Sequence, residues 1–190
     1  MNLQPDQIEE FLKRRTRKEL ARPGLIHAGV LILLFHKNDE LHVLLTKRSS
    51  DVEHHRGQIS FPGGAVDDLD TDIVATAVRE TEEEVGIRAT AIRVLGLFDD
   101  AWTPSGFRIT PVIGYIDGSP DVRPNPLEVE EVLEVALSFF VNSQNERVKQ
   151  VTHGEAIVDV YFYTYGTNEI WGATAGMLRS LVHALHVIRK

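Results

Sequence analysis

The run of residues 61–87 constrains the fold of this chain more than any other segment. It opens with Phe-Pro-Gly-Gly and closes with Arg-Glu-Thr-Glu-Glu-Glu-Val-Gly-Ile, so a turn signal precedes a strongly patterned stretch. At about 100° per residue, a helix gathers one small residue and three acidic residues in one arc, namely Thr76, Glu80, Glu83 and Glu84. A second arc is mostly apolar and predicts a buried face, made of Val74, Ala77, Val78, Thr81 and Val85.

The three glutamates of this predicted helix favour a bound cation. Carboxylates spaced at i, i+3 and i+4 repel one another, and no lysine shares their face. Carboxylate oxygens are the ligands that Mg²⁺ and Mn²⁺ prefer. A glutamate run alone is more typical of a solvated helix face. The presence of Gly63, Gly64, Arg79 and Gly86 in register favours the metal site instead.

The residues around the helix have local structural roles. Phe61 and Pro62 end a strand, and the two glycines after them allow a close approach of the backbone. Three candidates can cap the helix N-terminus, namely Asp70, Thr71 and Asp72. Gly86 lies where a left-handed C-terminal cap is expected, and the planar fork of Arg79 can hold a glutamate or the turn in place.

This pattern resembles the Nudix box, Gly-x5-Glu-x7-Arg-Glu-apolar-x-Glu-Glu-x-Gly-apolar, of hydrolases that split a nucleoside diphosphate linked to another group. Gly64 opens the box here, and residues 79–87 match its second half except for Thr81 at an apolar position. The first half departs from the pattern. Asp70 replaces the box glutamate, and eight residues rather than seven separate it from Arg79.

This longer spacing, with aspartate in place of glutamate, resembles the pattern of the coenzyme A pyrophosphatase branch of the family. The signature of this branch resembles residues 44–49, Gly57 and residues 61–64, although Glu53 occupies a position that is usually arginine. Further similarity lies at residues 110–112 and 170–174, so the resemblance spans most of residues 29–180.

The resemblance implies an α/β fold, the Nudix α/β/α sandwich with a central mixed sheet, and a divalent cofactor, Mg²⁺ or Mn²⁺. Glu80 and Glu84 are expected to ligate the metal directly, and Glu83 is expected to be a further ligand or to act on water. The expected catalytic residues are Glu83, Arg79 and, from outside the box, Glu128. The expected substrate contacts are Lys47, Arg48, Gly63 and Gly64.

The remaining pattern predicts strands interleaved with helices, as in a mixed sheet between helices. We predict strands at residues 28–35, 41–47, 92–98, 108–116, 131–136 and 156–164. We predict helices at residues 5–20, 137–144 and 174–188, in addition to the box helix. The box spans residues 64–87, and the whole chain, residues 1–190, is expected to form one domain.

Composition narrows the functional class. The sequence contains no cysteine, which excludes disulfides and thiolate chemistry. A net charge of −8 argues against nucleic acid as a partner. The sequence has neither a signal-type segment nor an apolar run of about 18 residues, so we expect a cytoplasmic protein without a membrane partner. The sequence leaves the oligomeric state open.

Several other features have competing interpretations. The basic run at residues 13–18 is more typical of a solvated helix face than of a phosphate site. The aromatic strand at residues 161–165 is more typical of packing than of base stacking. His54 and His55 are weak metal candidates, because Mg²⁺ does not favour imidazole. Trp102 and Phe107 flank a turn that suits a lid over the substrate.

The resemblance, together with these observations, implies a metal-dependent diphosphatase that acts on coenzyme A or its thioesters. The products are then 4′-phosphopantetheine, or its acyl form, and adenosine 3′,5′-bisphosphate. Two alternatives stay open. One is a Nudix hydrolase for ADP-ribose, NADH or another nucleoside diphosphate derivative, and the other is a non-catalytic nucleotide-sensing module of the same fold.

Overall fold

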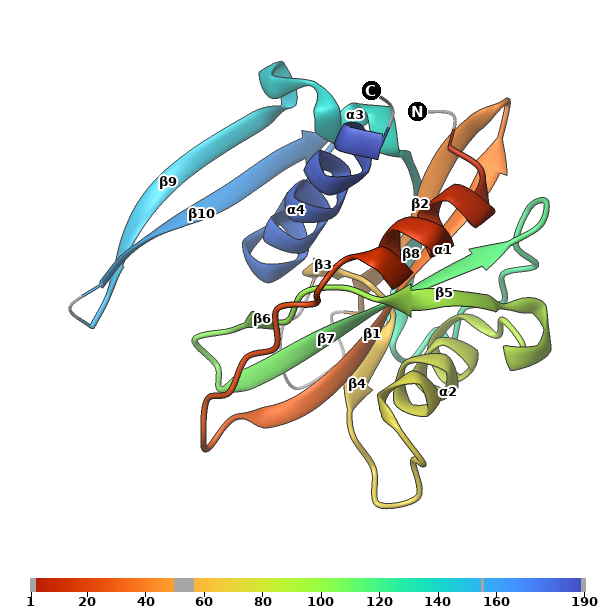
Figure 1. Cartoon of the computed structure of the whole chain (residues 1–190), viewed down its shortest axis with the longest axis horizontal. Helices are drawn as coiled ribbons and strands as arrows, with labels where there is room; N and C mark the ends of the chain where they lie inside the picture. Colours follow the sequence, from red (N-terminus) through yellow and green to blue (C-terminus); the bar gives the residue numbers. More distant parts are fainter. Residues whose placement is uncertain (1–2, 50–56, 155, 189–190) are drawn as a thin grey trace.

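A computed structural model describes residues 3–49, 57–154 and 156–188. Its larger sheet has the strand order β3-β2-β1-β7-β5, and β4, β6 and β8 pair with β1, β7 and β2 (Figure 1). β1 and β7 run parallel and the other described pairs in this sheet run antiparallel, so the sheet is mixed. Its strands are β1 (Ile26–Lys37), β2 (Glu40–Arg48), β3 (Ile59–Ser60), β4 (Gly63–Ala65), β5 (Arg93–Leu97), β6 (Ala101–Trp102), β7 (Phe107–Ile116) and β8 (Val129–Ala136).

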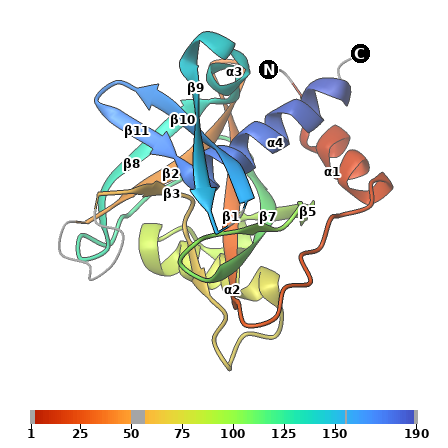
Figure 2. The same cartoon turned by 90° about the vertical axis from the view of Figure 1, so that its left-hand side faces the viewer.

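A smaller antiparallel sheet has the order β11-β10-β9 and lies beside the last helix (Figure 2). Its strands are β9 (Glu146–His153), β10 (Ala156–Tyr165) and β11 (Asn168–Trp171). The helices of the described residues are α1 (Pro5–Arg14), α2 (Ile73–Val85), α3 (Leu137–Val141) and α4 (Gly172–Ile188), with short 3₁₀ turns at Ala89–Ala91 and Ser143–Asn145. None of these helices is long and apolar enough to cross a membrane.

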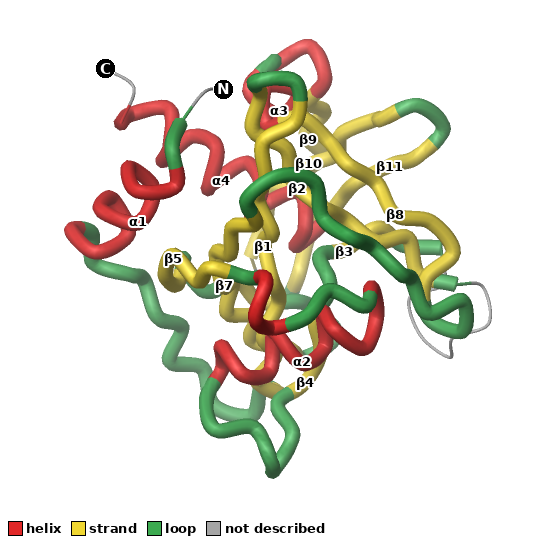
Figure 3. The backbone as a smooth tube through the Cα atoms, turned by 90° about the vertical axis from the view of Figure 1, so that its right-hand side faces the viewer, coloured by secondary structure: helices red, strands yellow, loops and turns green. Residues whose placement is uncertain are grey.

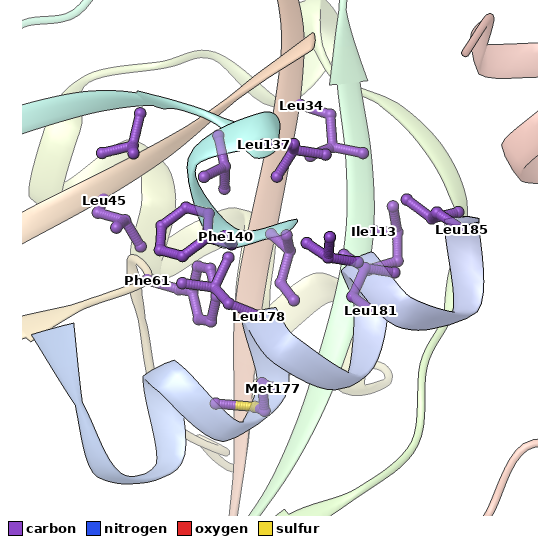
Figure 4. Close-up of a cluster of buried hydrophobic side chains, with 14 of the residues drawn as sticks. Leu34, Leu45, Phe61, Ile113, Leu137, Phe140, Met177, Leu178, Leu181 and Leu185 are labelled. Carbon is purple, nitrogen blue, oxygen red and sulfur yellow. The ribbon is translucent and has the colours of Figure 1, made fainter. Parts of the chain in front are cut away.

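The two faces of β1 pack against different helices, which builds the α/β/α sandwich. Val30, Ile32 and Leu34 belong to a buried cluster with α1 and α4. Leu31, Leu33 and Phe35 belong to a second cluster with α2. Figure 4 shows Leu34 and Ile113 facing the apolar stripe of α4, formed by Met177, Leu178, Leu181 and Leu185. Burial on both faces explains why β1 is an almost continuous apolar run.

Gly29 lets α2 lie close to β1. A Cβ atom at this position would lie 2.8 Å from the carbonyl oxygen of Ile73, in the first turn of α2. Figure 3 shows α2 across the strands, on the face away from α4. The glycine therefore sets how closely the box helix approaches the sheet.

The N-terminal helix is shorter than predicted, because it ends at Arg14 rather than near residue 20. Arg15 leaves the helix in an extended conformation, and its guanidinium contacts both carboxylate oxygens of Asp99 at 2.7 Å. Arg17 pairs with Asp100 at 2.7 Å. Lys13 and Arg14 pair with Glu9 and Glu10 within the helix. The basic run is thus only partly a helix face, because Arg15 and Arg17 bind acidic residues of the segment after β5.

Other boundaries differ by smaller amounts. The helix predicted at residues 137–144 is α3 followed by a 3₁₀ turn, and α4 begins two residues before the predicted start at residue 174. Strand β3 lies directly before Phe61 and Pro62, where a strand was predicted to end, whereas β4, β6, β9 and β11 were not predicted. The central mixed sheet with helices on both faces agrees with the predicted fold class.

Candidate active site

The ends of α2 follow from its sequence. The Asp72 side chain accepts a hydrogen bond from Ala75 N at 2.8 Å, so Asp72 is the N-cap among the three candidates. Gly86 has φ of 69°, and its N–H bonds to Glu82 O at 2.9 Å, which ends the helix in a left-handed cap. These caps fix the helical register of the glutamates between them.

Gly63 and Gly64 bring the backbone of β4 against the glutamate face of α2. A Cβ atom on Gly64 would lie 2.5 Å from the Glu80 carboxylate, and Gly63 has φ of 152°. A side chain at either position would displace its surroundings. The first role of both glycines is therefore to let the carboxylate and β4 approach each other, and their predicted contact with substrate stays a prediction.

Arg79 holds three carboxylates through one planar fork. Its Nε and Nη2 atoms donate to the two oxygens of Asp70 at 2.9 and 3.0 Å. Its Nη1 donates to Glu80 at 2.8 Å and to Glu83 at 3.0 Å. Hydrogen bonds from Arg79 hold the pKa of Asp70 well below its ordinary value. Asp70 is thus the partner of Arg79, a role that the sequence suggested only as capping.

Glu84 is a nearly buried carboxylate, with 4% of its surface exposed. Burial raises its pKa to about 7, against the lowering effects of Arg48 and of the Gly63 backbone N–H. The Arg48 guanidinium lies 3.9 Å from the Glu84 carboxylate. Burial also raises the pKa of Glu80, and the hydrogen bond from Arg79 opposes this rise. The helix face therefore carries two carboxylates whose charges are poorly solvated.

Glu128 lies close enough to this face to affect both carboxylates. Its charge contributes to the raised pKa values of Glu80 and Glu84. Its carbonyl oxygen accepts a hydrogen bond from Ser49 N at 2.8 Å, next to Arg48 at the end of β2. The structure thus brings residues from α2, from β2 and from the loop before β8 to one location.

The chemistry of these donors fits a hard divalent cation. Among the described residues, no three acidic or histidine side chains are already arranged around a metal position. Arg79 donates to Glu80 and Glu83 instead, while the buried Glu84 carboxylate has the Gly63 backbone N–H and the more distant Arg48 guanidinium as partners. Carboxylate oxygens one helical turn apart, partly desolvated and short of positive charge, are suitable ligands for Mg²⁺ or Mn²⁺. Arg79 donates to one oxygen of Glu80, so the other oxygen of this carboxylate can bind a cation while Arg79 stays in place.

The predicted substrate contacts differ in availability. Lys47 is paired with Glu130 at 2.7 Å, so its ammonium group already has an anionic partner. Arg48 is 31% exposed, and its buried Nε has no hydrogen-bond partner among the described residues. Arg48 is therefore better placed than Lys47 to contact a phosphate group of the substrate. Glu53, His54 and His55 lie outside the described residues.

Most of the aromatic residues considered as substrate contacts pack against other parts of the protein. Tyr163 is fully buried and donates to Glu146 at 2.7 Å, and Tyr161 and Tyr165 pack against the same core. Phe162 is stacked on Trp171, with ring centroids 6.1 Å apart. The Arg22 guanidinium lies over Trp102, 4.7 Å from the ring centroid. These contacts agree with packing, and the proposed lid role of Trp102 and Phe107 stays a prediction.

Asn125 was missed by sequence reasoning. Its side-chain amide donates to Glu128 Oε1 at 3.0 Å, and its backbone N–H donates to Glu84 O at 2.8 Å. The Pro-Asn-Pro sequence around it indicates a turn, but it does not indicate which helix the turn contacts.

Comparisons with known proteins show which family and which fold the chain resembles. The family model described as NUDIX domain matches residues 25–163. The chain is 36% identical over 161 residues to the uncharacterized Nudix hydrolase NudL of Photorhabdus laumondii, covering 85% of this chain and 86% of that protein. It is 35% identical over 178 residues to the NudL of Escherichia coli O6:H1, covering 92% of each. The crystal structure of a NUDIX hydrolase from Alicyclobacillus acidocaldarius has a similar fold, with a TM-score of 0.53 and 18% identity over 87% of this chain and 96% of that one.

Proposed function

The chain belongs to the NUDIX domain family, and from this premise we propose that its substrate is coenzyme A or a coenzyme A thioester. The coarser activity follows from the family, since the chain is a hydrolase of phosphoric anhydrides in nucleoside diphosphate derivatives. This excludes the non-catalytic sensing module considered from the sequence. A cytoplasmic location stays a prediction.

One observation carries the substrate proposal. The segment that resembles the coenzyme A branch ends β2 and supplies β4, and both parts meet the glutamate face of α2. Arg48 approaches Glu84 to 3.9 Å, and Gly64 faces Glu80 without room for a side chain. The branch signature therefore borders the position where the diphosphate is expected. Residues beside the reacting group are well placed to discriminate between the groups attached to it.

The residues divide the chemistry as follows. Mg²⁺ or Mn²⁺, when bound by Glu80 and Glu84, supplies positive charge that offsets the charge of the diphosphate. Glu83 is exposed and completes the ligand set or orients water. Glu128 accepts the proton of the attacking water. Arg48 contacts a phosphate oxygen, and Arg79 holds Glu80, Glu83 and the β4–α2 turn in their relative positions.

Hydrolysis of the diphosphate gives 4′-phosphopantetheine, or its acyl form, and adenosine 3′,5′-bisphosphate. The proposal is tested by kcat/KM for coenzyme A, dephospho-coenzyme A and ADP-ribose under one metal condition, with products resolved by chromatography. We expect coenzyme A to be cleaved best and ADP-ribose worst. One charge-assisted contact to the 3′-phosphate contributes about 1.5–3 kcal/mol, or about 10- to 150-fold. A higher kcat/KM for ADP-ribose overturns the substrate assignment and leaves the hydrolase class intact.

One observation favours the runner-up, a hydrolase for ADP-ribose or NADH. Lys47 is paired with Glu130, so it is a poor candidate for the 3′-phosphate. The Glu130→Gln variant tests this point, because it releases Lys47. If Lys47 contacts the 3′-phosphate, this variant cleaves coenzyme A better relative to dephospho-coenzyme A than the wild type does.

A further inference from the structure

The loop of residues 121–128 is fastened to the last turn of α2. The final carbonyl groups of any helix lack partners within the helix. Here Arg123 N donates to Val85 O at 2.7 Å, and Asn125 N donates to Glu84 O at 2.8 Å. The contact is close, because a Cβ atom on Gly86 would lie 2.9 Å from Arg123 O. The loop therefore completes the C-terminus of the helix that carries the glutamates.

Asn125 connects this cap to Glu128. Its amide nitrogen donates to Glu128 Oε1 at 3.0 Å, and its Oδ1 accepts from Leu127 N at 3.2 Å. Its carbonyl oxygen accepts from Glu128 N at 3.0 Å and from Val129 N at 2.8 Å. One residue thus contacts the backbone of Glu84, the backbone turn that leads into β8, and the carboxylate of Glu128.

Without the hydrogen bond from the Asn125 amide, electrostatic repulsion would favour rotation of the Glu128 carboxylate away from α2. It lies near the carboxylates of Glu80 and Glu84, and like charges repel. It belongs to a partly exposed loop, so water is accessible to alternative rotamers. An amide donor offsets part of this tendency without adding a positive charge, and it engages only one of the two carboxylate oxygens.

We propose that Asn125 is a positioning residue of the hydrolase, which holds the Glu128 carboxylate toward the glutamate face of α2. This role rests on the proposed function in one respect, namely that Glu128 acts as the general base. Asn125 acts through Glu128 and touches no substrate. It also links the position of Glu128 to that of Glu84, because the backbone of Asn125 is bonded to the backbone of Glu84.

The Asn125→Asp variant isolates the side-chain contact. Aspartate has nearly the same shape, keeps an oxygen for Leu127 N–H and keeps the backbone bonds, but it replaces the donor to Glu128 with an anion. We expect kcat to fall about 10- to 100-fold, since small displacements of a catalytic group have effects of this size. We expect KM to change less than about threefold, because Glu128 acts on water rather than on bound substrate.

A double-mutant cycle with Glu128→Gln separates positioning from a general loss of structure. If Asn125 acts through the Glu128 carboxylate, Asn125→Asp lowers kcat by less than about twofold in the Glu128→Gln background. Losses that multiply in the double variant overturn the proposal. Asn142→Asp is the matched control, because Asn142 accepts a similar turn hydrogen bond from Gln144 N at 3.0 Å and lies outside the candidate site. Its kcat should equal that of the wild type.

The outcomes also separate this proposal from the proposed function. If Glu128→Gln keeps wild-type turnover while Glu80→Gln loses it, the hydrolase stands and the role of Asn125 is refuted. If Asn125→Asp does not fold, Asn125→Ser replaces it, because serine still accepts a turn hydrogen bond but is too short to reach Glu128. An unchanged kcat in the folded variant, whichever of the two it is, refutes the proposal.

Discussion

Burial of Glu84 should contribute a loss of stability to the metal-free protein as pH rises, and Glu84→Gln should remove this contribution. The pKa of Glu84 is raised from an ordinary value of 4.5 to about 7 by burial. Above pH 4.5 the unfolded chain releases this proton, whereas the folded chain retains it until about pH 7. Rising pH therefore favours unfolding across this window. A shift of this size corresponds to about 3 kcal/mol when both states are ionised.

The assay is urea unfolding of the wild type and of Glu84→Gln at pH 5, 6, 7 and 8, with a chelator present. Between pH 5 and pH 8 we expect the wild type to lose about 2–3 kcal/mol relative to the variant. Glu82→Gln is the control, because Glu82 lies on the same helix and is exposed. The difference between this control and the wild type should not change with pH.

Metal completes the test. With Mg²⁺ at pH 8 the wild type should regain stability, because the cation replaces the missing positive charge, while Glu84→Gln should gain much less. The kcat of Glu84→Gln should be lower than that of the wild type by about 10³-fold or more, which corresponds to several kcal/mol of transition-state stabilisation. Parallel stability curves for wild type and variant across this pH range would refute the reasoning, as would wild-type turnover in Glu84→Gln at saturating Mg²⁺.

Two further variants test residues that hold the glutamates of α2 in place. Asp70→Asn removes the bidentate partner of Arg79, so we expect kcat at saturating Mg²⁺ to fall about 10- to 100-fold as the Arg79 guanidinium loses its orientation. An unchanged kcat would mean that Asp70 serves only the turn. Gly64→Ala places a Cβ atom against Glu80 and should lower kcat at least about tenfold. Gly176→Ala, where a Cβ atom meets open space, is its control and should leave kcat unchanged.

The sequence predicted the box helix well because its signals are local. Asp72 and Gly86 cap the helix within one residue of its ends, and the apolar arc between them faces the sheet. The end of α1 had no such signal. The helix stops where Arg15 and Arg17 meet Asp99 and Asp100, and these acids lie more than 80 residues away in the sequence. Tertiary ion pairs of this kind override a weak helical preference.

The same distinction applies to the candidate site. Glu80, Glu83 and Glu84 were predicted from their spacing on one helix, and the structure places them on one face. The partners of Lys47 and Glu128 depend on strand pairing and on loop docking. Lys47 lies beside β8 only because β2 pairs with that strand, which brings Glu130 to it. The spacing of residues within one element could not reveal this.

Asp70, where the Nudix pattern has glutamate, lies in the turn between β4 and α2. Aspartate is one methylene shorter than the usual glutamate. The extra residue before Arg79 accompanies a compact turn, in which Asp70 N bonds to Asp67 O at 3.0 Å and Asp67 N bonds to Asp70 Oδ2 at 2.9 Å. This turn carries the shorter carboxylate to the guanidinium, where both oxygens accept hydrogen bonds. Arg79 keeps a bidentate partner, and its Nη1 remains directed at the glutamates of α2.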